Sequence, residues 1–516
     1  MDTLRRVAVV AAGLLLSRVA RGQPTPPTER QLLERTVQMY FDGWATGDSA
    51  LLGRAMHPSA HLKRSIDGKF VDMTREQYVG GMRPHARDST LVTRIASVDI
   101  VGAMASVRAE ISINTSTFVD FFNMLRTDEG WFIVDKVSVR VPRGSTPGGP
   151  PHAVKETVME GLNRPWGMVF LSANEVLISE KEGDLLRVDL RTKARTRIAG
   201  FPSDMADSVG TFGFGDNTGK FDVVLDPAFA SNRLVYLSYA ATNKRGKTTK
   251  IVRARLVNDS LQQVQTLFLA EPYSPDRHHY GGGMVFGRDG KLYFTVGERL
   301  FNERDEPAWP FAQDRTDRRG KVYRLNPDGS IPADNPDFGA GAVRGLYAVG
   351  IRASQGLTVH PGTHAIWFTE HGTQQGDELN VLKAGANYGW PLRTTGKYRD
   401  STYVPPAPRD SLTAPIWSWP HTVAPTALLF YTGDEFPSWR NSLFVGGLSR
   451  GSVWRMTVDG ETVLSAEELF VDARERIREV VQSPSGELYL LTDDKNGKLV
   501  RVRNGPATPV GVRTAR

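Results

Sequence analysis

Trp166-Gly167-Met168-Val169-Phe170, followed by a turn and by Val176-Leu177-Ile178-Ser179-Glu180, is the stretch that decides the fold of most of this chain. Two short apolar runs joined by a turn predict two paired strands, and the second run ends at an acidic residue. The pattern recurs, and the further copies begin at Phe221, Gly283, Gly356, Pro425 and Arg478. Six copies at a spacing of about 50–70 residues predict an all-β six-bladed β-propeller over residues 154–504. No long amphipathic helix intervenes, which argues against an α/β barrel.

Residues 28–142 lack the propeller repeat and combine apolar residues at helical spacing with strand-like runs. This pattern predicts a smaller α+β domain ahead of the propeller. Thr28 and Gln31 form a capping-box pattern before an apolar series at helical spacing, and Thr74 and Gln77 repeat that pattern. Strand-like runs follow near residues 93–101, 103–113, 115–126 and 131–141. His57, which precedes Pro58, is interpreted as a structural loop residue.

Three motifs in this region are Tyr40-Phe41-Asp42-Gly43, Phe118-Val119-Asp120-Phe121-Phe122 and Gly130-Trp131-Phe132-Ile133-Val134. They resemble the lumazine-binding-like branch of the nuclear transport factor 2-like (SnoaL-like) superfamily. The resemblance implies a curved sheet wrapped by helices around a cone-shaped cavity. Some members of that superfamily are enzymes, and many are ligand-binding or dimerising modules. We recognise no catalytic set of Asp and His residues here, so the role of this domain stays open.

The segments outside these two regions are predicted to be a signal peptide, a linker and a tail. A basic pair, an apolar run from Val7 to Leu16 and a small-residue cleavage pattern predict a secretory signal peptide over residues 1–22. That run is too short to cross a bilayer of about 30 Å, and no other segment is long and apolar enough. The Pro/Gly-rich residues 143–153 predict an extended linker, and residues 505–516 are expected to form a flexible tail. We therefore expect a periplasmic or secreted protein that does not span a membrane.

The composition excludes several classes of function. Lys and Arg number 64 against 57 Asp and Glu, and the net charge of +7 is spread along the chain without a run of like charges. That distribution indicates attraction to anionic ligands or simple solubility, and it argues against nucleic-acid binding. The chain has no cysteine, which excludes disulfides, thiolate zinc sites and a cysteine nucleophile.

Three groups of residues in the propeller region carry candidate chemistry. Adjacent residues on a strand point to opposite faces, so His278 and His279 are not expected to share one metal, and one of them suits either a general base or a structural loop position beside the Gly-rich turn. Arg476 and Arg478 alternate on a predicted strand, and their guanidinium groups suit either a carboxylate ligand or a surface ion-pair stripe. The Gly-rich turn at residues 376–380 suits either a calcium ion or solvent.

A series of ordered motifs runs through nearly the whole propeller region. It includes Arg164-Pro165-Trp166-Gly167, His279-Tyr280-Gly281-Gly282, Thr295-Val296-Gly297-Glu298, Gly350-Ile351-Arg352, Glu370-His371-Gly372, Gly376-Asp377-Glu378-Leu379-Asn380, Asn387-Tyr388-Gly389-Trp390-Pro391 and Arg476-Ile477-Arg478. In type and order these motifs resemble the soluble quinoprotein glucose/aldose sugar dehydrogenases, which use pyrroloquinoline quinone. The resemblance implies oxidation of the C1 hydroxyl of an aldose, or of a related sugar or alcohol, by hydride transfer to the quinone. An external electron acceptor then completes the reaction.

The resemblance also implies roles for individual residues. His279 matches the general base, Glu298 the acid that orients it, and Arg352 the arginine beside the reactive quinone oxygen. The cofactor-binding positions are Asn217, Arg352, Arg476 and Arg478. A calcium ion on the cofactor is expected to take the backbone carbonyls of Gly372 and Thr373. A second, structural calcium ion is expected at Glu378 and Tyr388.

Several positions depart from the family pattern. Ala353 stands where Asn is usual and Ser449 where Lys is expected, and the further departures are Asn217, Gly283 and Thr373. Losing two charge-assisted contacts of about 1.5–3 kcal/mol each raises the expected cofactor Kd about a hundredfold or more. A propeller that binds or scaffolds without tight quinone binding is therefore the alternative function. A calcium-dependent lactone hydrolase is disfavoured because the axial positions hold arginines. Dimerisation is compatible with both folds and is left open.

Overall fold

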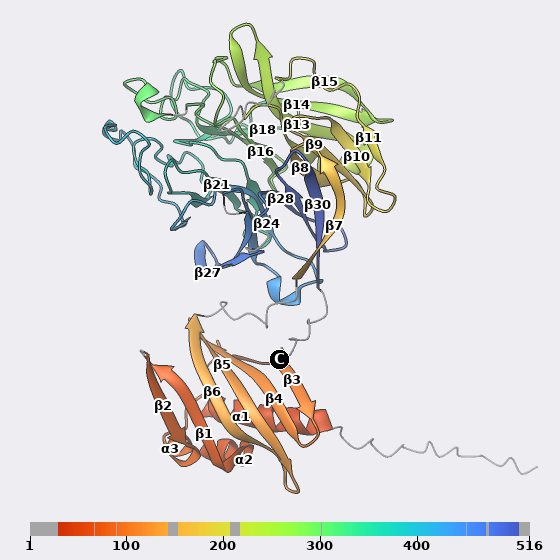
Figure 1. The fold of residues 1–516 in the computed structure, drawn as a ribbon. Coiled ribbons are helices and arrows are strands. Elements are labelled where there is room, and N and C mark those ends of the chain that lie inside the picture. Colours follow the sequence, from red (N-terminus) through yellow and green to blue (C-terminus); the bar gives the residue numbers. More distant parts are fainter. Residues whose placement is uncertain are drawn as a thin grey trace, which may run out of the picture. The chain divides into compact units, whose positions relative to one another are not determined.

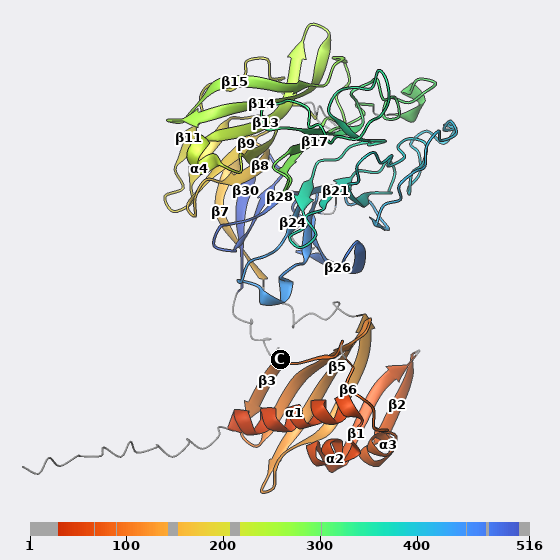
Figure 2. The ribbon, with the colours of Figure 1, turned by 180° about the vertical axis from the view of Figure 1, so that it is seen from behind.

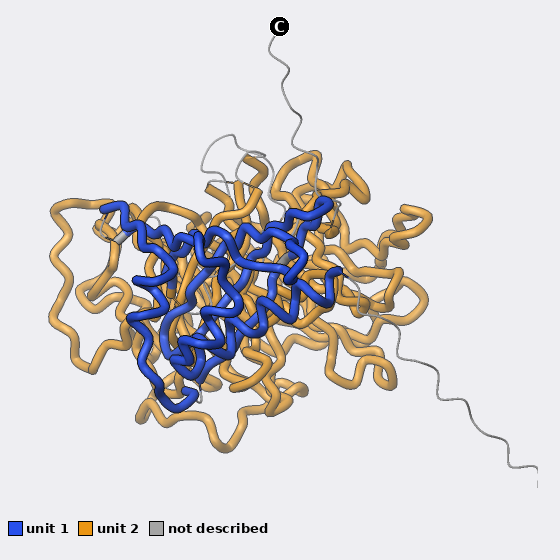
Figure 3. Tube along the Cα trace, turned by 90° about the horizontal axis from the view of Figure 1, so that it is seen from below, with its two compact units in different colours: residues 1–141 blue, residues 142–516 orange. Residues whose placement is uncertain are grey.

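The computed structural model describes residues 29–66, 68–88, 90–142, 153–206, 217–300, 302–449, 451–470 and 474–504. The predicted signal peptide, Thr28, most of the predicted linker and the predicted tail lie outside these residues. The chain divides into two compact units, Met1–Val141 and Pro142–Arg516 (Figure 3). Among the described helices, none is both long enough and apolar enough to cross a membrane.

The first unit is a six-stranded sheet of order β2-β1-β6-β5-β4-β3, and helix α1 lies across one of its faces (Figure 2). The strands are β1 (Met56–Ile66), β2 (Lys69–Thr74), β3 (Val92–Val101), β4 (Met104–Ile113), β5 (Ser116–Thr127) and β6 (Gly130–Pro142). The helices are α1 (Glu29–Thr46), α2 (Ser49–Ala55) and α3 (Arg75–Gly80). The predicted small α+β domain is thereby confirmed.

Helix α1 buries the apolar face that its sequence spacing predicts. Leu33, Val37 and Tyr40 have no exposed surface and share one core with side chains of β4, β5 and β6. The predicted capping box at the start of α3 is also present. Thr74 Oγ1 accepts a hydrogen bond from the Gln77 amide at 3.3 Å, and Gln77 Oε1 accepts one from the Thr74 amide at 3.0 Å.

His57 lies in strand β1, so its interpretation as a loop residue is wrong. Its Nδ1 lies 2.7 Å from the hydroxyl of Ser59. The pairing of β1 with β6 shifts register between Met56 and His61. This irregularity accommodates Pro58, which has no N–H to donate to a regular ladder.

The second unit is the predicted six-bladed β-propeller: its described residues form six four-stranded sheets (Figure 1). The first strand of each sheet contacts the first strands of two neighbouring sheets, so that the six strands close a ring. These strands are β8 (Pro165–Phe170), β12 (Lys220–Leu225), β16 (Gly281–Phe286), β20 (Leu357–Val359), β24 (Pro425–Phe430) and β28 (Ile477–Gln482). Each coincides with the start of a repeat in the sequence.

The remaining strands follow outward in each sheet. In the first three sheets they are β9 (Glu175–Glu180), β10 (Leu185–Asp189), β11 (Arg195–Arg197), β13 (Leu234–Asn243), β14 (Gly246–Val257), β15 (Ser260–Leu269), β17 (Leu292–Val296), β18 (Lys321–Leu325) and β19 (Leu346–Val349). In the last three they are β21 (Ile366–Glu370), β22 (Glu378–Val381), β23 (Trp417–Ser418), β25 (Leu443–Gly447), β26 (Ser452–Asp459), β27 (Thr462–Leu469), β29 (Leu488–Thr492) and β30 (Gly497–Asn504). Three short helices, α4 (Phe229–Asn232), η1 (Glu303–Asp305) and η2 (Pro437–Trp439), lie in connections.

The last sheet takes its outer strand from the beginning of the unit. Strand β7 (Ala153–Leu162) pairs antiparallel with β30, which places the first and last strands of the propeller side by side. Backbone hydrogen bonds therefore close the ring. Leu162 is fully buried there, in a core that also contains Met168 of β8 and Leu499 of β30.

Replacing Leu162 by Ala tests this closure. We expect Leu162→Ala to lower the free energy of unfolding by about 2–5 kcal/mol, because it leaves a cavity where the first and last strands meet. Urea unfolding followed by tryptophan fluorescence measures the change. Val154→Ala, at a half-exposed position of the same strand, is the matched control. Equal effects of the two substitutions would show that the β7 seam does not limit stability.

Candidate active site

One end of the ring gathers polar residues from several sheets. Because neighbouring strands run antiparallel, the start of each first strand lies beside the end of the second strand of its sheet. His279, Arg352 and Arg476 precede β16, β20 and β28. The acids that end or follow the second strands of the same sheets are Glu298, Glu370 and Asp493. Residues far apart in the sequence therefore meet at this end.

His279 and Glu298, predicted as base and orienting acid, form a buried pair. His279 Nδ1 lies 2.5 Å from Glu298 Oε1, and their side chains are 13% and 1% exposed. The other carboxylate oxygen accepts a hydrogen bond from the Leu300 amide at 2.5 Å. Gly297 is required here, because a Cβ at that position would lie 1.9 Å from the carbonyl oxygen of His279. The acid is therefore held from two sides and fixes the imidazole ring.

The environment keeps the His279 ring neutral. Burial, followed by the positive charge of Arg352, lowers its pKa well below the ordinary value of histidine. Burial also raises the pKa of the Glu298 carboxyl. When Nδ1 carries the ring proton and donates it to Glu298, Nε2 is left with a lone pair that can accept a proton. This is the state that a general base needs before reaction.

Arg352, the third predicted catalytic residue, belongs to the same hydrogen-bond network. Its carbonyl oxygen accepts a hydrogen bond from the Glu298 amide at 2.9 Å. Its own amide donates to Glu370 Oε1 at 2.6 Å, and its Nη1 donates to the carbonyl of Gly372 at 2.6 Å. The guanidinium group also lies 5.1 Å from the centre of the Trp390 ring. The side chain is thus a buried positive charge with a fixed direction.

Arg476 and Arg478 converge on one carboxylate. Both Nη2 atoms donate to Asp493 Oδ2, at 2.7 Å and 2.9 Å, and Arg478 Nη1 donates to Gln355 Oε1. The two arginines hold the pKa of Asp493 well below its ordinary value despite burial. Arg476 has a half-exposed side chain, whereas that of Arg478 is 7% exposed. The pair shares one face, as predicted, and an internal acid orients it.

The predicted calcium ligands lie near this network and are engaged by other protein groups. The Gly372 carbonyl accepts from Arg352, Glu378 Oε1 accepts from the Thr395 hydroxyl at 2.8 Å, and the Tyr388 hydroxyl donates to the Val381 carbonyl at 2.6 Å. Glu378 and Tyr388 thus have different hydrogen-bond partners. The described part of the chain contains no cluster of three His, Asp or Glu side chains arranged for a metal.

Two buried oxygens beside Gly372 nevertheless suit a hard cation. Thr373 Oγ1 and Glu370 Oε2 have no hydrogen-bond partner among the described groups. Glu370 also faces Glu378 across the β21–β22 pairing, and the charge of Glu378 adds to burial in raising the pKa of Glu370. Oxygen donors of this kind are the ligands that calcium prefers.

Asn217 lies at the same end of the ring, as do Ala353 and Ser449, the two positions that depart from the family pattern of cofactor contacts. The Asn217 amide donates to the carbonyl of Arg277, two residues before His279, at 2.8 Å. Ala353 is 1% exposed, and its carbonyl accepts from the His371 amide at 3.0 Å. Ser449 is exposed and follows Leu448, whose carbonyl accepts from Arg476 Nη1 at 3.3 Å. A longer polar side chain at position 449 would therefore start beside Arg476.

Sequence reasoning missed three contributors to the site. Burial, followed by Arg478, lowers the pKa of Lys181 to about 8. His371 Nε2 lies 2.7 Å from the carbonyl of Pro425. The positive charge of Arg399 contributes to lowering the pKa of both His279 and Arg352. The backbone amide of Arg399 donates a hydrogen bond to the Glu303 carboxylate at 3.0 Å, which holds the Arg399 segment in place. Lys181 and His371 directly follow Glu180 and Glu370, so their repeat position was the available signal.

The arrangement suits a planar ligand with several carboxylates, such as pyrroloquinoline quinone. Two arginines share a single internal acid, so they retain unbalanced positive charge, and Lys181 lies close enough to respond to them. Guanidinium groups bind carboxylates in fixed, bidentate geometry. The neutral His279 and cationic Arg352 lie at the same end of the ring, so proton transfer can take place next to such a ligand.

Asp493→Asn tests whether this acid holds the arginine pair. We expect a loss of about 3–5 kcal/mol in the free energy of unfolding, because the change leaves buried positive charge without its partner. Chemical denaturation measures the loss. Asp494→Asn, at the exposed neighbouring residue, is the control and should leave the unfolding curve unchanged. A curve for Asp493→Asn that matches this control would contradict the role of Asp493.

Each of the two regions of this chain matches a known protein family. The family described as Glucose / Sorbosone dehydrogenase matches residues 162–501, and the family described as Putative lumazine-binding matches residues 28–138. An aldose sugar dehydrogenase of Escherichia coli is 34% identical over 355 residues, which cover 67% of this chain and 92% of that protein. Quinoprotein glucose dehydrogenase B of Acinetobacter calcoaceticus is 28% identical over 418 residues, covering 66% and 85%.

Solved structures agree with these relatives. A glucose dehydrogenase structure has a TM-score of 0.62 at 35% identity, covering 69% of this chain and 100% of the other. The PQQ-bound form of an aldose sugar dehydrogenase from Streptomyces coelicolor has a TM-score of 0.55 at 25% identity, covering 69% and 99%. The family match spans more than half of the chain and coincides with the propeller. This chain therefore belongs to the glucose/sorbosone dehydrogenase family.

Proposed function

We propose that this protein is an exported quinoprotein oxidoreductase that oxidises the C1 hydroxyl of an aldose, or of a related sugar or alcohol. The observation that carries the proposal is the buried network of His279, Glu298 and Arg352 at the end of the ring. The relatives named as aldose sugar and glucose dehydrogenases support this substrate class. When bound, pyrroloquinoline quinone supplies the two-electron acceptor for the hydride that leaves C1.

His279 is proposed to remove the proton of the C1 hydroxyl at Nε2. Its lowered pKa keeps the ring neutral at physiological pH, so the base is ready without prior deprotonation. Glu298 holds the ring at Nδ1 and stabilises the imidazolium that forms when the proton arrives. Arg352 places a positive charge beside the reacting atoms, where it stabilises negative charge that develops during transfer.

Arg476 and Arg478 are proposed to hold the carboxylates of the cofactor, with Asn217 at its border. The exposed half of Arg476 is the part available to a ligand, while Asp493 fixes its direction. A calcium ion is proposed beside Gly372 and Thr373, supported by the unpartnered oxygens of Glu370 and Thr373. The structural calcium ion expected at Glu378 and Tyr388 gains no such support, because both side chains are engaged by other protein groups. Addition of a chelator should then release the ion beside Gly372.

A propeller that binds or scaffolds without tight quinone binding remains the second candidate. The observation that favours it is that Ala353 and Ser449 stand where the family pattern has Asn and Lys. The predicted signal peptide supports export to the periplasm or the outside of the cell. An external electron acceptor is part of the proposed reaction, and the first unit would provide a ligand-binding or dimerising module.

His279→Ala tests the proposed reaction. We expect dye-linked aldose oxidation that needs added pyrroloquinoline quinone and calcium, and a loss of about 10²–10⁴-fold in kcat for His279→Ala, since the base is removed. His278→Ala is the matched control and should keep most of the activity. Absence of activity in the unmodified protein, with no quinone retained, would favour the binding protein instead.

Ser449→Lys tests the degenerate cofactor contact. Restoring the lysine beside Arg476 should tighten quinone binding by about tenfold or more, because a charge-assisted contact contributes about 1.5–3 kcal/mol. Titration of the apoprotein with the quinone, followed by protein fluorescence, measures the Kd. Ser485→Lys, in a turn remote from the arginine pair, is the control. An equal Kd in both variants would refute a cofactor contact at position 449.

A further inference from the structure

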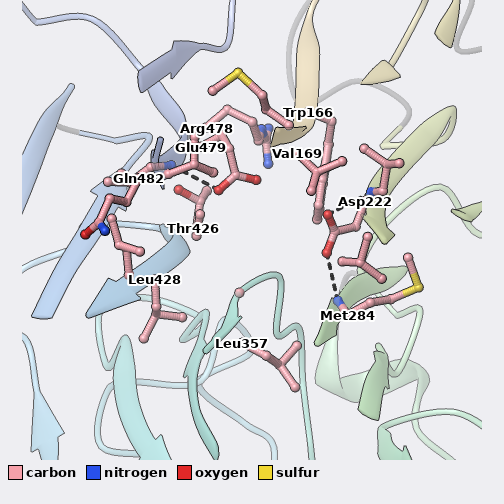
Figure 4. Close-up of a pocket in the computed structure, with 18 of the residues that line it drawn as sticks. Trp166, Val169, Asp222, Met284, Leu357, Thr426, Leu428, Arg478, Glu479 and Gln482 are labelled. Carbon is pink, nitrogen blue, oxygen red and sulfur yellow. Dashed lines mark hydrogen bonds between the residues drawn. The ribbon is translucent and has the colours of Figure 1, made fainter. Parts of the chain in front are cut away.

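A cavity of about 410 Å³ lies inside the ring and is lined by residues of all six first strands or their flanks (Figure 4). It contains Arg478 and Gln355, but not His279, Glu298 or Arg352. The cavity therefore shares Arg478 with the proposed cofactor-binding pair but does not include the proposed catalytic residues. Its size falls in the range of small-molecule sites, which is about 300–1,000 Å³.

The cavity is polar near the starts of the strands and mostly apolar toward their ends. Among the described residues, the charged side chains that line it are those of Asp222, Glu479 and Arg478, which lie near the starts of β12 and β28. Further along the strands the wall is formed by Val169, Phe170, Val224, Leu428, Leu429 and Pro484. A ligand with one charged end and a short apolar body fits such a gradient.

The two acids face the open space from different sheets. Figure 4 shows the carboxyl groups of Asp222 and Glu479 on opposite sides of the cavity, both pointing into it. Glu479 is 8% exposed, and one of its oxygens accepts a hydrogen bond from the Val480 amide at 3.0 Å. The charge of Asp222 adds to burial in raising the pKa of Glu479. The two groups are therefore close enough to interact across the cavity.

Arg478 offsets this pair only in part, because its positive charge lowers the pKa of Glu479 against the larger effect of burial. Its guanidinium donates to Asp493 and to Gln355, as described for the arginine pair. Two buried carboxyl groups thus share a largely apolar chamber, where burial favours their protonated forms over their ionised forms. A cationic ligand would stabilise the ionised forms.

The surroundings favour an organic cation over a metal ion. Both oxygens of Asp222 already accept backbone hydrogen bonds, from the Val223 amide at 2.8 Å and the Met284 amide at 2.9 Å. Among the described lining residues no His or third acid completes a metal shell. The Trp166 ring and the aliphatic wall instead suit the body of an alkyl ammonium ion.

We propose that this axial cavity is a binding site for a small primary aliphatic amine, with its ammonium group between Asp222 and Glu479 and its alkyl chain along the apolar wall. The proposal does not rest on the proposed sugar oxidation. It requires neither the quinone nor calcium, so its test is carried out on the apoprotein.

The pair makes binding dependent on pH. Burial raises the pKa of Asp222 to about 7 and that of Glu479 well above its ordinary value. The charged group facing them is Arg478, with Lys181 and Asp493 behind it; the lining residues from β8, β16, β20 and β24 include no titratable side chain. Both acids are protonated at low pH, so an entering ammonium ion must displace protons. Affinity should therefore rise as the pH rises through 7.

Isothermal titration calorimetry of the full chain with n-butylamine tests the proposal, and n-butanol serves as the neutral probe. We expect binding of the amine but not the alcohol, with proton release shown by different heats in buffers of different ionisation enthalpy. The Kd should fall about tenfold between about pH 6 and about pH 8, because a carboxyl with a pKa of about 7 ionises over that interval.

Glu479→Gln is the variant that isolates the site, because an amide keeps an acceptor for the Val480 N–H. It should weaken amine binding about tenfold or more and abolish most of the proton release. Glu487→Gln, in the turn between β28 and β29 and outside the cavity lining, is the matched control and should bind as the unmodified protein does. Equal binding of amine and alcohol, no binding heat, or unchanged affinity in Glu479→Gln would each overturn the proposal.

Discussion

The site depends on one repeated interaction: an acid at the end of a second strand binds the segment that leads into the first strand of the same sheet. Glu180 accepts from the amide of Asn163 at 2.8 Å, and Glu370 accepts from that of Arg352 at 2.6 Å. In two other sheets the acid at this position contacts side chains instead of a backbone amide. Glu298 contacts His279, and Asp493 accepts hydrogen bonds from Arg476 and Arg478. The strand pairing brings the partners together, and the acid then sets their direction.

This interaction places charge where water is scarce. Apart from the half-exposed Arg476, the carboxylates and guanidinium groups at the end of the ring are buried, so each must be paired or hydrogen-bonded to remain there. The same scarcity of water keeps His279 neutral and lowers the pKa of Lys181 to about 8. The propeller thus supplies both a rigid frame and the electrostatic conditions for proton transfer, and the ring closure through β7 maintains both.

Much of the fold follows from local pattern. The six repeat starts coincide with β8, β12, β16, β20, β24 and β28, because alternating apolar runs bounded by turns define strands without reference to distant residues. The capping box of Thr74 and Gln77 is local for the same reason. His57 was misplaced because the irregular pairing of β1 with β6, which admits Pro58 into a strand, is a property of two distant segments.

For the site, the sequence by itself determined the kinds of residue and their repeat positions, and these identify His279, Glu298, Arg352, Arg476 and Arg478 through resemblance to a family. Only the tertiary structure decided which of them touch. Asp493 occupies the same repeat position as Glu298 and Glu370, yet its contact with two arginines depends on the pairing of β28 with β29. The axial cavity, with Asp222 opposite Glu479, is likewise decided by ring closure. Hydrogen bonds and burial act over a few ångströms in space, and sequence separation does not measure that distance.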